Sequence, residues 1–284
     1  MKILITGSNG MLGRTFVHEL QHHEVIAATR EHFDIRNAEQ TSSFIRSCSP
    51  DVVLHCAAMT QVDACEEEQD LAFAVNAIGS GNVAIASHHA GARLIAISTD
   101  YVFDGSAERP YHEWDTTQPK TVYGQSKWAG EEAIRAHCPN HLICRTAWLY
   151  GGQGPSFLHT MLRLGKQEGP TLKIVNDQQG NPTSCHALSS YIQQHLLTTP
   201  HVGTAHLTCE GEATWFTFAQ AIFDNQQLSR ELVPCTTKEF PRPAPRPANS
   251  RLEKRFLRLQ QLPPMPHWND AMNTFLASSS QADQ

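Results

Sequence analysis

The feature that most constrains the fold is a series of short, continuously apolar segments that alternate with helical patterns in the first half of the chain. These segments show no polar–apolar alternation, which is typical of strands that helices cover on both faces of a parallel sheet. They are KILIT (2–6), EVIAAT (24–29), DVVLHC (51–56) and RLIAIS (93–98). Helical patterns lie between them, as in residues 71–91. The alternation predicts an α/β fold with a doubly wound parallel sheet.

The rhythm changes after about residue 150. Residues 157–167, 186–198 and 215–225 predict helices, whereas 171–175 and 204–209 predict strands, and the segment PRPAPRPANS (241–250) is expected to be extended because proline disfavours helix at the residue before it. We therefore expect a core of residues 1–150, to which the chain can return later, and a smaller C-terminal α/β lobe of residues 151–284.

Composition excludes several classes of protein. The formal net charge of −6 offers no basic surface for nucleic acid or an anionic membrane. The eight cysteines contain no C-x-x-C pair, and the sixteen histidines show no metal-ligand spacing, so we expect reduced thiols and no metal site. MKILITG runs straight into a predicted strand, and no apolar run approaches the roughly 18 residues that cross a bilayer. A cytoplasmic protein is expected.

The first strand leads into GSNGMLG, with glycines at 7, 10 and 13, and then into a helix. Gly7, Gly10 and Gly13 allow a tight turn and a close approach of the backbone to a pyrophosphate, and the helix N-terminus supplies N–H donors. This pattern predicts a dinucleotide site of the Rossmann type within residues 1–150.

Two further segments bear on the cofactor. The second strand ends in Thr29 and Arg30, where an acid would accept hydrogen bonds from the adenosine ribose and an arginine would suit a 2′-phosphate. We therefore expect NADPH, with NADH as the alternative. Ala57 and Ala58 end the third strand; their small side chains would let a flat cofactor lie across it, although packing explains them equally well.

The chemistry is predicted by STDYVFDG (98–105) and TVYGQSKWAGEE (121–132). Thr99 falls at the carboxyl edge of the sheet, where ligands bind, and Tyr123 and Lys127 share one helix face. A tyrosine pKa of about 10 would fall beside an ammonium and an oxidised nicotinamide. The set predicts hydride transfer to a carbonyl carbon, with Tyr123 donating the proton, Thr99 holding the oxygen and Lys127 anchoring the nicotinamide ribose. Gly124 and Gly130 should allow close approach to the cofactor or the sheet.

These motifs resemble the extended short-chain dehydrogenase/reductases. Still closer is the resemblance to the dTDP-4-dehydrorhamnose reductase family, carried in order by STDYVFDG, VYGQSKWAGE, CRTAWLYGGQG, FLHTMLRL, VNDQQGNPT and RPANSRLE. The resemblance implies that Thr99, Tyr123 and Lys127 are catalytic. It implies cofactor contacts at Gly10, Met11, Leu12, Arg30, Asp34, Ile35, Ala57 and Ala58, and substrate contacts at Asp100, Trp148, Asn249, Ser250 and Arg251. Arg251 would bind a diphosphate, and Arg145 is a second candidate for that role.

The reaction implied is reduction of dTDP-4-dehydro-6-deoxy-L-mannose to dTDP-L-rhamnose. Reduction of another nucleotide-linked 4-keto-6-deoxyhexose is an alternative, as is a non-catalytic NADP-binding subunit of the type that regulates methionine adenosyltransferase. Asn76 matches an asparagine common in the superfamily but could equally tether a helix to a strand. Some relatives dimerise around magnesium through glutamates; the aligned positions, Thr15 and His186, are not acidic. We expect a monomer or a homodimer.

Overall fold

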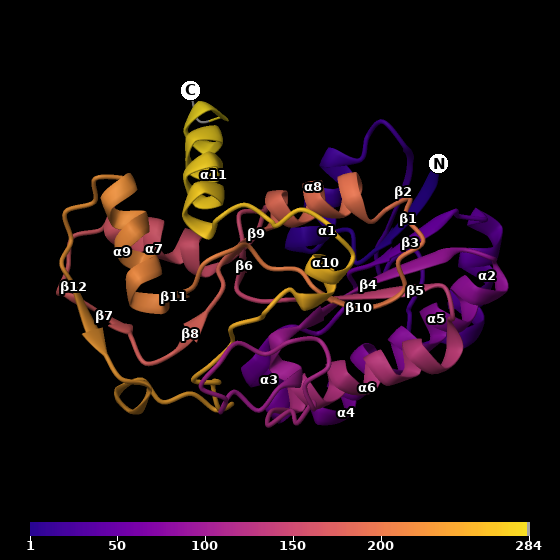
Figure 1. Cartoon of the computed structure of the whole chain (residues 1–284), viewed down its shortest axis with the longest axis horizontal. Helices are drawn as coiled ribbons and strands as arrows, with labels where there is room; N and C mark the ends of the chain where they lie inside the picture. The colour runs from indigo at the N-terminus through magenta and orange to yellow at the C-terminus, as the bar shows by residue number, and fades with distance from the viewer. Residues whose placement is uncertain (283–284) are drawn as a thin grey trace.

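The computed structural model describes residues 1–282 and has a six-stranded, fully parallel sheet at its centre (Figure 1). The strand order is β10-β5-β4-β3-β1-β2. The strands are β1 (Lys2–Thr6), β2 (Glu24–Ala28), β3 (Val52–His55), β4 (Arg93–Thr99), β5 (His141–Thr146) and β10 (Gly203–His206). The order reverses between β1 and β3, and ligands of such sheets bind at the carboxyl ends of strands beside this reversal. The predicted doubly wound fold is confirmed.

Helices cover both faces of the sheet, which explains why its strands are continuously apolar. Ile3 and Ile5 of β1 face a core shared with one set of helices, and Leu4 faces the core of the other set. The first set is α1 (Met11–Glu19) and α8 (Cys185–His195); the second is α2 (Ala38–Cys48), α5 (Ser80–His89) and α6 (Val122–His137). Figure 1 shows α1 and α8 on one side of the sheet and α5 and α6 on the other.

Between β3 and β4 the chain forms three short helical segments before α5. They are α3 (Val62–Glu67), α4 (Gln69–Phe73) and the π-helical turn η1 (Ala74–Gly79). A π-turn inside a helix often marks a functional region. The single predicted helix at 71–91 is thus interrupted by η1, which carries Asn76.

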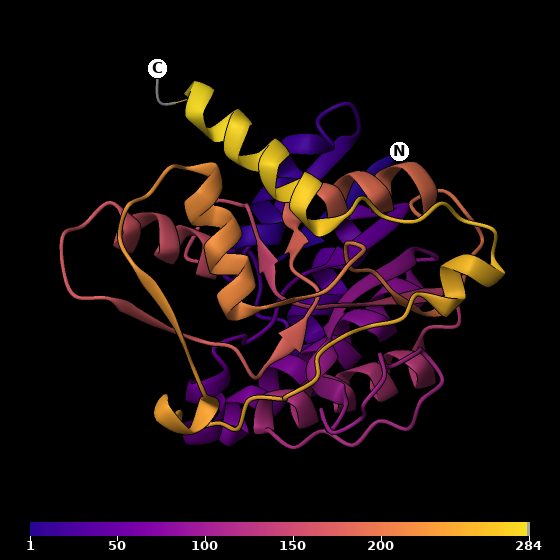
Figure 2. The ribbon, with the colours of Figure 1, turned by 60° about the vertical axis from the view of Figure 1, so that its left-hand side comes forward.

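The second half of the chain supplies a smaller α/β lobe beyond the sheet (Figure 2). Its paired strands are β7 (Leu172–Val175) with β12 (Leu232–Cys235), β8 (Gln179–Gly180) with β11 (Ala213–Thr214), and β6 (Leu149–Tyr150) with β9 (Thr183–Ser184). Its helices are α7 (Phe157–Gly165), α9 (Trp215–Asn225) and α11 (Trp268–Ala282), whereas α10 (Arg255–Leu259) packs against β10 of the central sheet. The 3-10 turns of the chain are η2 (Asp100–Val102) and η3 (Thr237–Glu239).

The chain returns from this lobe to the sheet through α8 and β10. One apolar cluster joins Ile3 and Phe16 of the first half to Leu188 and Phe218 of the second, so the two halves share a core. The predicted boundary at residue 150 stays a prediction. All eight cysteines are free. In the part of the chain that the structure describes, no helix is both long and apolar enough to span a bilayer.

Candidate active site

The glycine loop forms a cradle between β1 and α1. Gly7 has a φ of +66°, and a Cβ there would lie 2.7 Å from the Cα of Ala57; a Cβ on Gly13 would lie 2.3 Å from the carbonyl oxygen of Gly7. Gly10 precedes α1 in an extended conformation, and no described side chain caps the helix. The first N–H groups of α1 therefore point out of the helix end with its positive dipole. This cradle fits the pyrophosphate of a dinucleotide.

The end of β4 carries Thr99 and Asp100, both buried. The Thr99 hydroxyl donates to Oδ1 of Asp100 (3.0 Å) and accepts from the Tyr101 N–H (3.2 Å), which starts η2. Burial raises the pKa of Asp100 to about 6, against the lowering effect of hydrogen bonds from Ser250 and Thr99. Asp100 is thus a buried carboxyl group at the carboxyl end of β4, and its surroundings shift its pKa toward neutrality.

Helix α6 presents Tyr123 and Lys127 to the same point. Its first N–H groups are satisfied by Thr121, whose side chain accepts from the Gly124 N–H (3.0 Å), and by Glu66, which accepts from the Val122 N–H (2.9 Å). Glu66 belongs to the acidic run 66–68, and its bond to Val122 shows that it caps a helix. No metal-binding cluster occurs among the described residues. The helix start, and with it Tyr123, is held firmly.

Gly124 and Gly130 let α6 approach other backbone segments. A Cβ on Gly124 would lie 2.2 Å from the carbonyl oxygen of Tyr101, and one on Gly130 would lie 2.2 Å from that of Asn76. The close contacts are to η2 and η1, so the predicted approach to the sheet is wrong, and the approach to the cofactor stays a prediction. Asn76 bonds both backbone groups of Met59 and the hydroxyl of Ser126, so it is a tether between the β3 loop, η1 and α6.

The electrostatics of the pair differ from the sequence-based expectation. Burial raises the pKa of Tyr123 above its ordinary value, although a hydrogen bond with Thr99 works to lower it. Nζ of Lys127 donates to the Ile97 carbonyl (2.8 Å), and burial lowers the pKa of Lys127 to about 8, against the opposing charge of Glu131. The protein therefore keeps the Tyr123 phenol protonated, which is the form that a proton donor requires.

Glu131 lies one turn beyond Lys127 and is the centre of a buried charge network. It accepts from the Ser98 hydroxyl (2.6 Å), twice from Arg145 (2.9 and 2.7 Å), and from Arg135 (2.8 Å). These bonds hold the pKa of Glu131 at about 2 although burial works to raise it. The guanidinium of Arg145 is thus engaged inside the protein, and its predicted role as a diphosphate ligand is wrong.

One cavity of about 410 Å³ joins the glycine loop to the catalytic candidates. We refer to it as the catalytic cavity. The predicted residues in its wall are Gly7, Gly10, Met11, Leu12, Gly13, Ala58, Thr99, Asp100, Tyr123, Lys127 and Trp148. The wall also holds the hydroxyl of Thr146, a buried oxygen with no hydrogen-bond partner among the described residues. A cradle with open N–H groups and a free polar oxygen fits a dinucleotide beside the Thr99–Tyr123–Lys127 set.

The other predicted cofactor residues lie outside this wall. Arg30 is three-quarters exposed, and its Nε lies 3.5 Å from Asp34. Asp34 also binds Arg36, which holds the pKa of Asp34 at about 2. Ile35 is buried against Gly79, and Ala57 packs on Gly7. Arg30 and Asp34 follow β2 on the sheet side where an adenosine ribose would lie.

A second cavity of about 700 Å³ adjoins the first; we refer to it as the lobe cavity. Tyr101, Trp148 and Trp215 line both. Trp148 has a φ of +49° and stacks on Trp215, with ring centres 3.5 Å apart and planes at 6°. The Trp215 indole N–H donates to Gln178 (3.0 Å). The resemblance predicted Trp148, but Tyr101 and Trp215 were missed because nothing in their local sequence separates a cavity wall from an apolar core.

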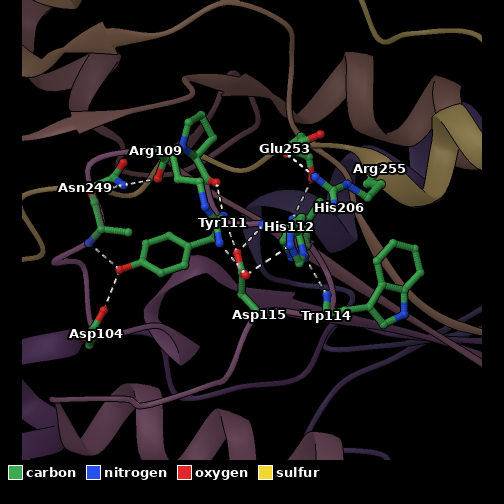
Figure 3. Close-up of polar contacts among 12 residues, drawn as sticks. Asp104, Arg109, Tyr111, His112, Trp114, Asp115, His206, Asn249, Glu253 and Arg255 are labelled. Carbon is green, nitrogen blue, oxygen red and sulfur yellow. Dashed lines mark hydrogen bonds and ion pairs between the residues drawn. The ribbon is translucent and has the colours of Figure 1, made fainter.

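The lobe cavity has cationic groups and apolar walls. Its cations are Lys173, Arg230, Arg242 and Arg246, and Ser250 also lines it. Of the predicted substrate residues, Asn249 and Arg251 do not line it. Asn249 donates to the carbonyls of Ala107 and Arg109 (2.7 and 2.8 Å) and so fastens a loop. Figure 3 shows Asn249 beside Arg109, near Tyr111 and Asp104.

Arg251 faces a third cavity, lined also by Glu212. Its guanidinium binds Glu212 (2.8 Å), Asn249 (2.8 Å) and the carbonyl of Glu108 (2.7 Å). The predicted contact of Arg251 with the diphosphate is therefore not supported by its position.

A parallel sheet with a glycine loop after β1 and a Tyr-x-x-x-Lys helix at one cavity is the architecture of the extended short-chain dehydrogenase/reductases. Residues 1–281 match the family described as RmlD substrate binding domain. Two relatives are each 38% identical: the spore coat polysaccharide biosynthesis protein SpsK of Bacillus subtilis, over 99% of both chains, and dTDP-4-dehydrorhamnose reductase of Salmonella typhimurium, over 89% of both. The chain therefore belongs to the dTDP-4-dehydrorhamnose reductase family, a family of oxidoreductases.

Solved structures agree with this assignment. A dTDP-4-dehydrorhamnose reductase from Clostridium acetobutylicum superposes with a TM-score of 0.95 at 42% identity and covers 99% of this chain and 100% of its own. The dTDP-4-dehydrorhamnose reductase of Bacillus anthracis, solved in complex with NADP, also superposes with a TM-score of 0.95. It is 38% identical and covers 98% of this chain and 99% of its own.

Proposed function

We propose that this protein uses NADPH to reduce the C4 ketone of dTDP-4-dehydro-6-deoxy-L-mannose, giving dTDP-L-rhamnose for polysaccharide biosynthesis. The observation that carries the proposal is the catalytic cavity, in which the glycine loop, Thr99, Tyr123 and Lys127 share one wall. The reductase names of the relatives and the NADP complex of the Bacillus anthracis enzyme support it.

The cofactor half of the site would be the glycine loop and the end of β2. Gly7, Gly10 and Gly13, with the N–H groups of Met11 and Leu12, would hold the pyrophosphate. Arg30 would pair with the 2′-phosphate; Asp34, Ile35, Ala57 and Ala58 would lie along the adenosine and the nicotinamide side. When bound, NADPH supplies the hydride that reduces the ketone carbon.

Tyr123 would donate its phenolic proton to the ketone oxygen, which becomes the C4 hydroxyl. Thr99 would donate a hydrogen bond to the same oxygen and hold it against the phenol. Lys127, while charged, would stabilise the phenolate left on Tyr123 until solvent returns the proton. Asp100 and Trp148 would contact the sugar nucleotide at the junction of the two cavities, and Ser250 would meet it from the lobe side.

Purified protein tests the proposal when NADPH oxidation is followed with dTDP-4-dehydro-6-deoxy-L-mannose and the product is analysed by NMR. We expect oxidation only with the ketosugar, and dTDP-L-rhamnose as product. UDP- and GDP-linked ketosugars serve as the comparison: faster turnover of either would assign a different substrate. Absence of NADPH oxidation with every ketosugar would overturn the proposal.

A further inference from the structure

The proline-rich segment of residues 241–250 lines the lobe cavity, and the residues that hold it in place come from distant parts of the sequence. We refer to this segment as the strap. In Figures 1 and 2 the chain after β12 runs beside α3 before it climbs toward α10. At one end of the strap, Pro247 packs on Gly105, where a Cβ would lie 2.3 Å from the proline ring, and the N–H of Ser250 donates to Gln179 (2.7 Å).

The other end of the strap is held by one carboxylate, that of Asp63. Its Oδ1 accepts from the Ala244 N–H (3.1 Å) and lies 2.9 Å from the guanidinium of Arg246; its Oδ2 lies 3.7 Å from Arg242. Ala244 is buried, and the Arg246 side chain is only 17% exposed. Asp63 therefore fixes the strap backbone and Arg246, and it lies within ion-pair distance of Arg242.

Arg246 has donors to spare after these contacts. Nη1 donates to the Ala244 carbonyl (2.9 Å) and Nη2 binds Asp63, whereas a guanidinium has five N–H groups on three nitrogens. Arg246 and Arg242 both line the lobe cavity. A fixed, planar guanidinium is the group best suited to bind the oxygens of a diphosphate in pairs.

Asp63 also adjoins the catalytic cavity through the chain. It directly follows Val62, and Ala58, Thr60 and Val62 line the catalytic cavity. Asp63 is therefore the point at which the cofactor-side wall and the strap of the lobe cavity are joined.

We propose that Asp63 is a positioning residue that holds Arg246, with Arg242 beside it, to bind the diphosphate of the nucleotide sugar in the lobe cavity. The inference rests on the proposed function for the identity of the ligand. It transfers the diphosphate role from Arg251, which faces another cavity, to arginines of the strap. The neutral Asp63→Asn side chain would keep the shape but lose the charge that orients the guanidinium.

The test measures dTDP binding by calorimetry to the NADP-loaded protein, together with KM and kcat for the ketosugar. Asp63→Asn should weaken dTDP binding and raise KM about tenfold, the effect of losing one charge-assisted bond, while kcat and the Kd for NADPH stay within about twofold. The matched control is Glu67→Gln, which removes the same charge from an exposed position of α3 and should change neither value.

Arg246→Gln should cause a similar loss, and Asp63→Asn should add little in that background, because Asp63 acts through Arg246. Unchanged or tighter dTDP binding in Asp63→Asn would overturn the inference, as would fully additive losses. A wild-type protein that binds no dTDP would overturn it too. A wild type that binds dTDP but reduces no ketosugar would count against the proposed reaction and leave Asp63 to be judged by the binding data.

Discussion

The catalytic cavity and the lobe cavity are built in different ways. The first is formed by the carboxyl ends of β1, β3 and β4 and by the starts of α1 and α6, which buried bonds such as those of Asn76 and Glu131 hold in place. The second is formed by α7, β7, the start of α9 and the strap, whose charged groups come from separate segments. In the proposed function, proton transfer thus belongs to rigid elements, whereas the charges for ligand recognition come from separate segments.

Replacement of the proposed proton donor should have the largest effect and should be confined to chemistry. Tyr123→Phe removes the phenolic proton and is expected to lower kcat by about 10²–10⁴-fold, the usual contribution of a general acid. The phenyl ring keeps the packing on Tyr101, so the structure should not change. The Kd values for NADPH and dTDP should not change. Turnover near the wild-type rate would remove Tyr123 from the mechanism.

The rigidity of the catalytic half can be tested at Glu131. Glu131→Gln should lower the free energy of unfolding by about 3 kcal/mol, because it leaves Arg145 charged and unpaired in the interior; urea unfolding measures this. Glu132→Gln is the matched control, since Glu132 also binds Arg135 but is half exposed, and should cost less than about 1 kcal/mol. Equal losses in the two variants would mean that the buried ion-pair network stabilises the fold no more than an exposed ion pair does.

The two cavities should also respond differently to pH. Lys127 is charged below its pKa of about 8 and neutral above it, so kcat should fall about tenfold per pH unit above that value if the ammonium is required. Glu131 raises the pKa of Lys127, so Glu131→Gln should move the decline to lower pH. The lobe cavity is lined by arginines, which remain charged, and dTDP binding should stay flat between pH 7 and 9. A kcat that stays constant to pH 9.5 would contradict this role of Lys127.

The preference for NADPH is a smaller effect because Arg30 is largely exposed. Arg30→Ala should reduce the ratio of kcat/KM for NADPH over NADH by about fivefold, which corresponds to the roughly 1 kcal/mol of an exposed ion pair. Steady-state kinetics with both cofactors measure the ratio. A ratio that is unchanged by the substitution would exclude Arg30 from recognition of the 2′-phosphate.

The smallest effect is expected at Arg251. Arg251 faces the third cavity and binds Glu212. Arg251→Ala should therefore change the KM for the ketosugar by less than about threefold, well below the loss expected for a charge-assisted hydrogen bond to the substrate. Arg246→Gln is the comparison and should have the larger effect. A larger KM change at Arg251 would place the diphosphate near it after all and weaken the distinction between the two arginines.

The sequence predicted the catalytic cavity better than the lobe cavity, for physical reasons. The strands, the glycine loop and the Tyr123–Lys127 pair are specified by local periodicity and spacing, and the carboxyl ends of parallel strands must meet at one sheet edge. Even there, the burial that raises the pKa of Tyr123 depends on packing that spacing does not reveal.

The proposed recognition in the lobe depends on contacts between residues that are distant in sequence. Asp63 and Ala244 are 181 positions apart. That contact places Arg246 in the wall of the lobe cavity, whereas the bond of Arg251 to Asn249 holds Arg251 at another cavity. Trp148 was predicted by family resemblance alone, and its partner Trp215 begins a helix whose pattern shows only that it is amphipathic. These features needed the folded chain.

The stacked indoles of Trp148 and Trp215 have an optical consequence. Two parallel indole rings with centres 3.5 Å apart share their excited states, so the pair should dominate the near-ultraviolet circular dichroism of the protein. Since both rings line the two cavities, a molecule that enters either one and tilts a ring would alter this signal and the intrinsic fluorescence. The pair would thus serve as a spectroscopic reporter at the junction of the two cavities.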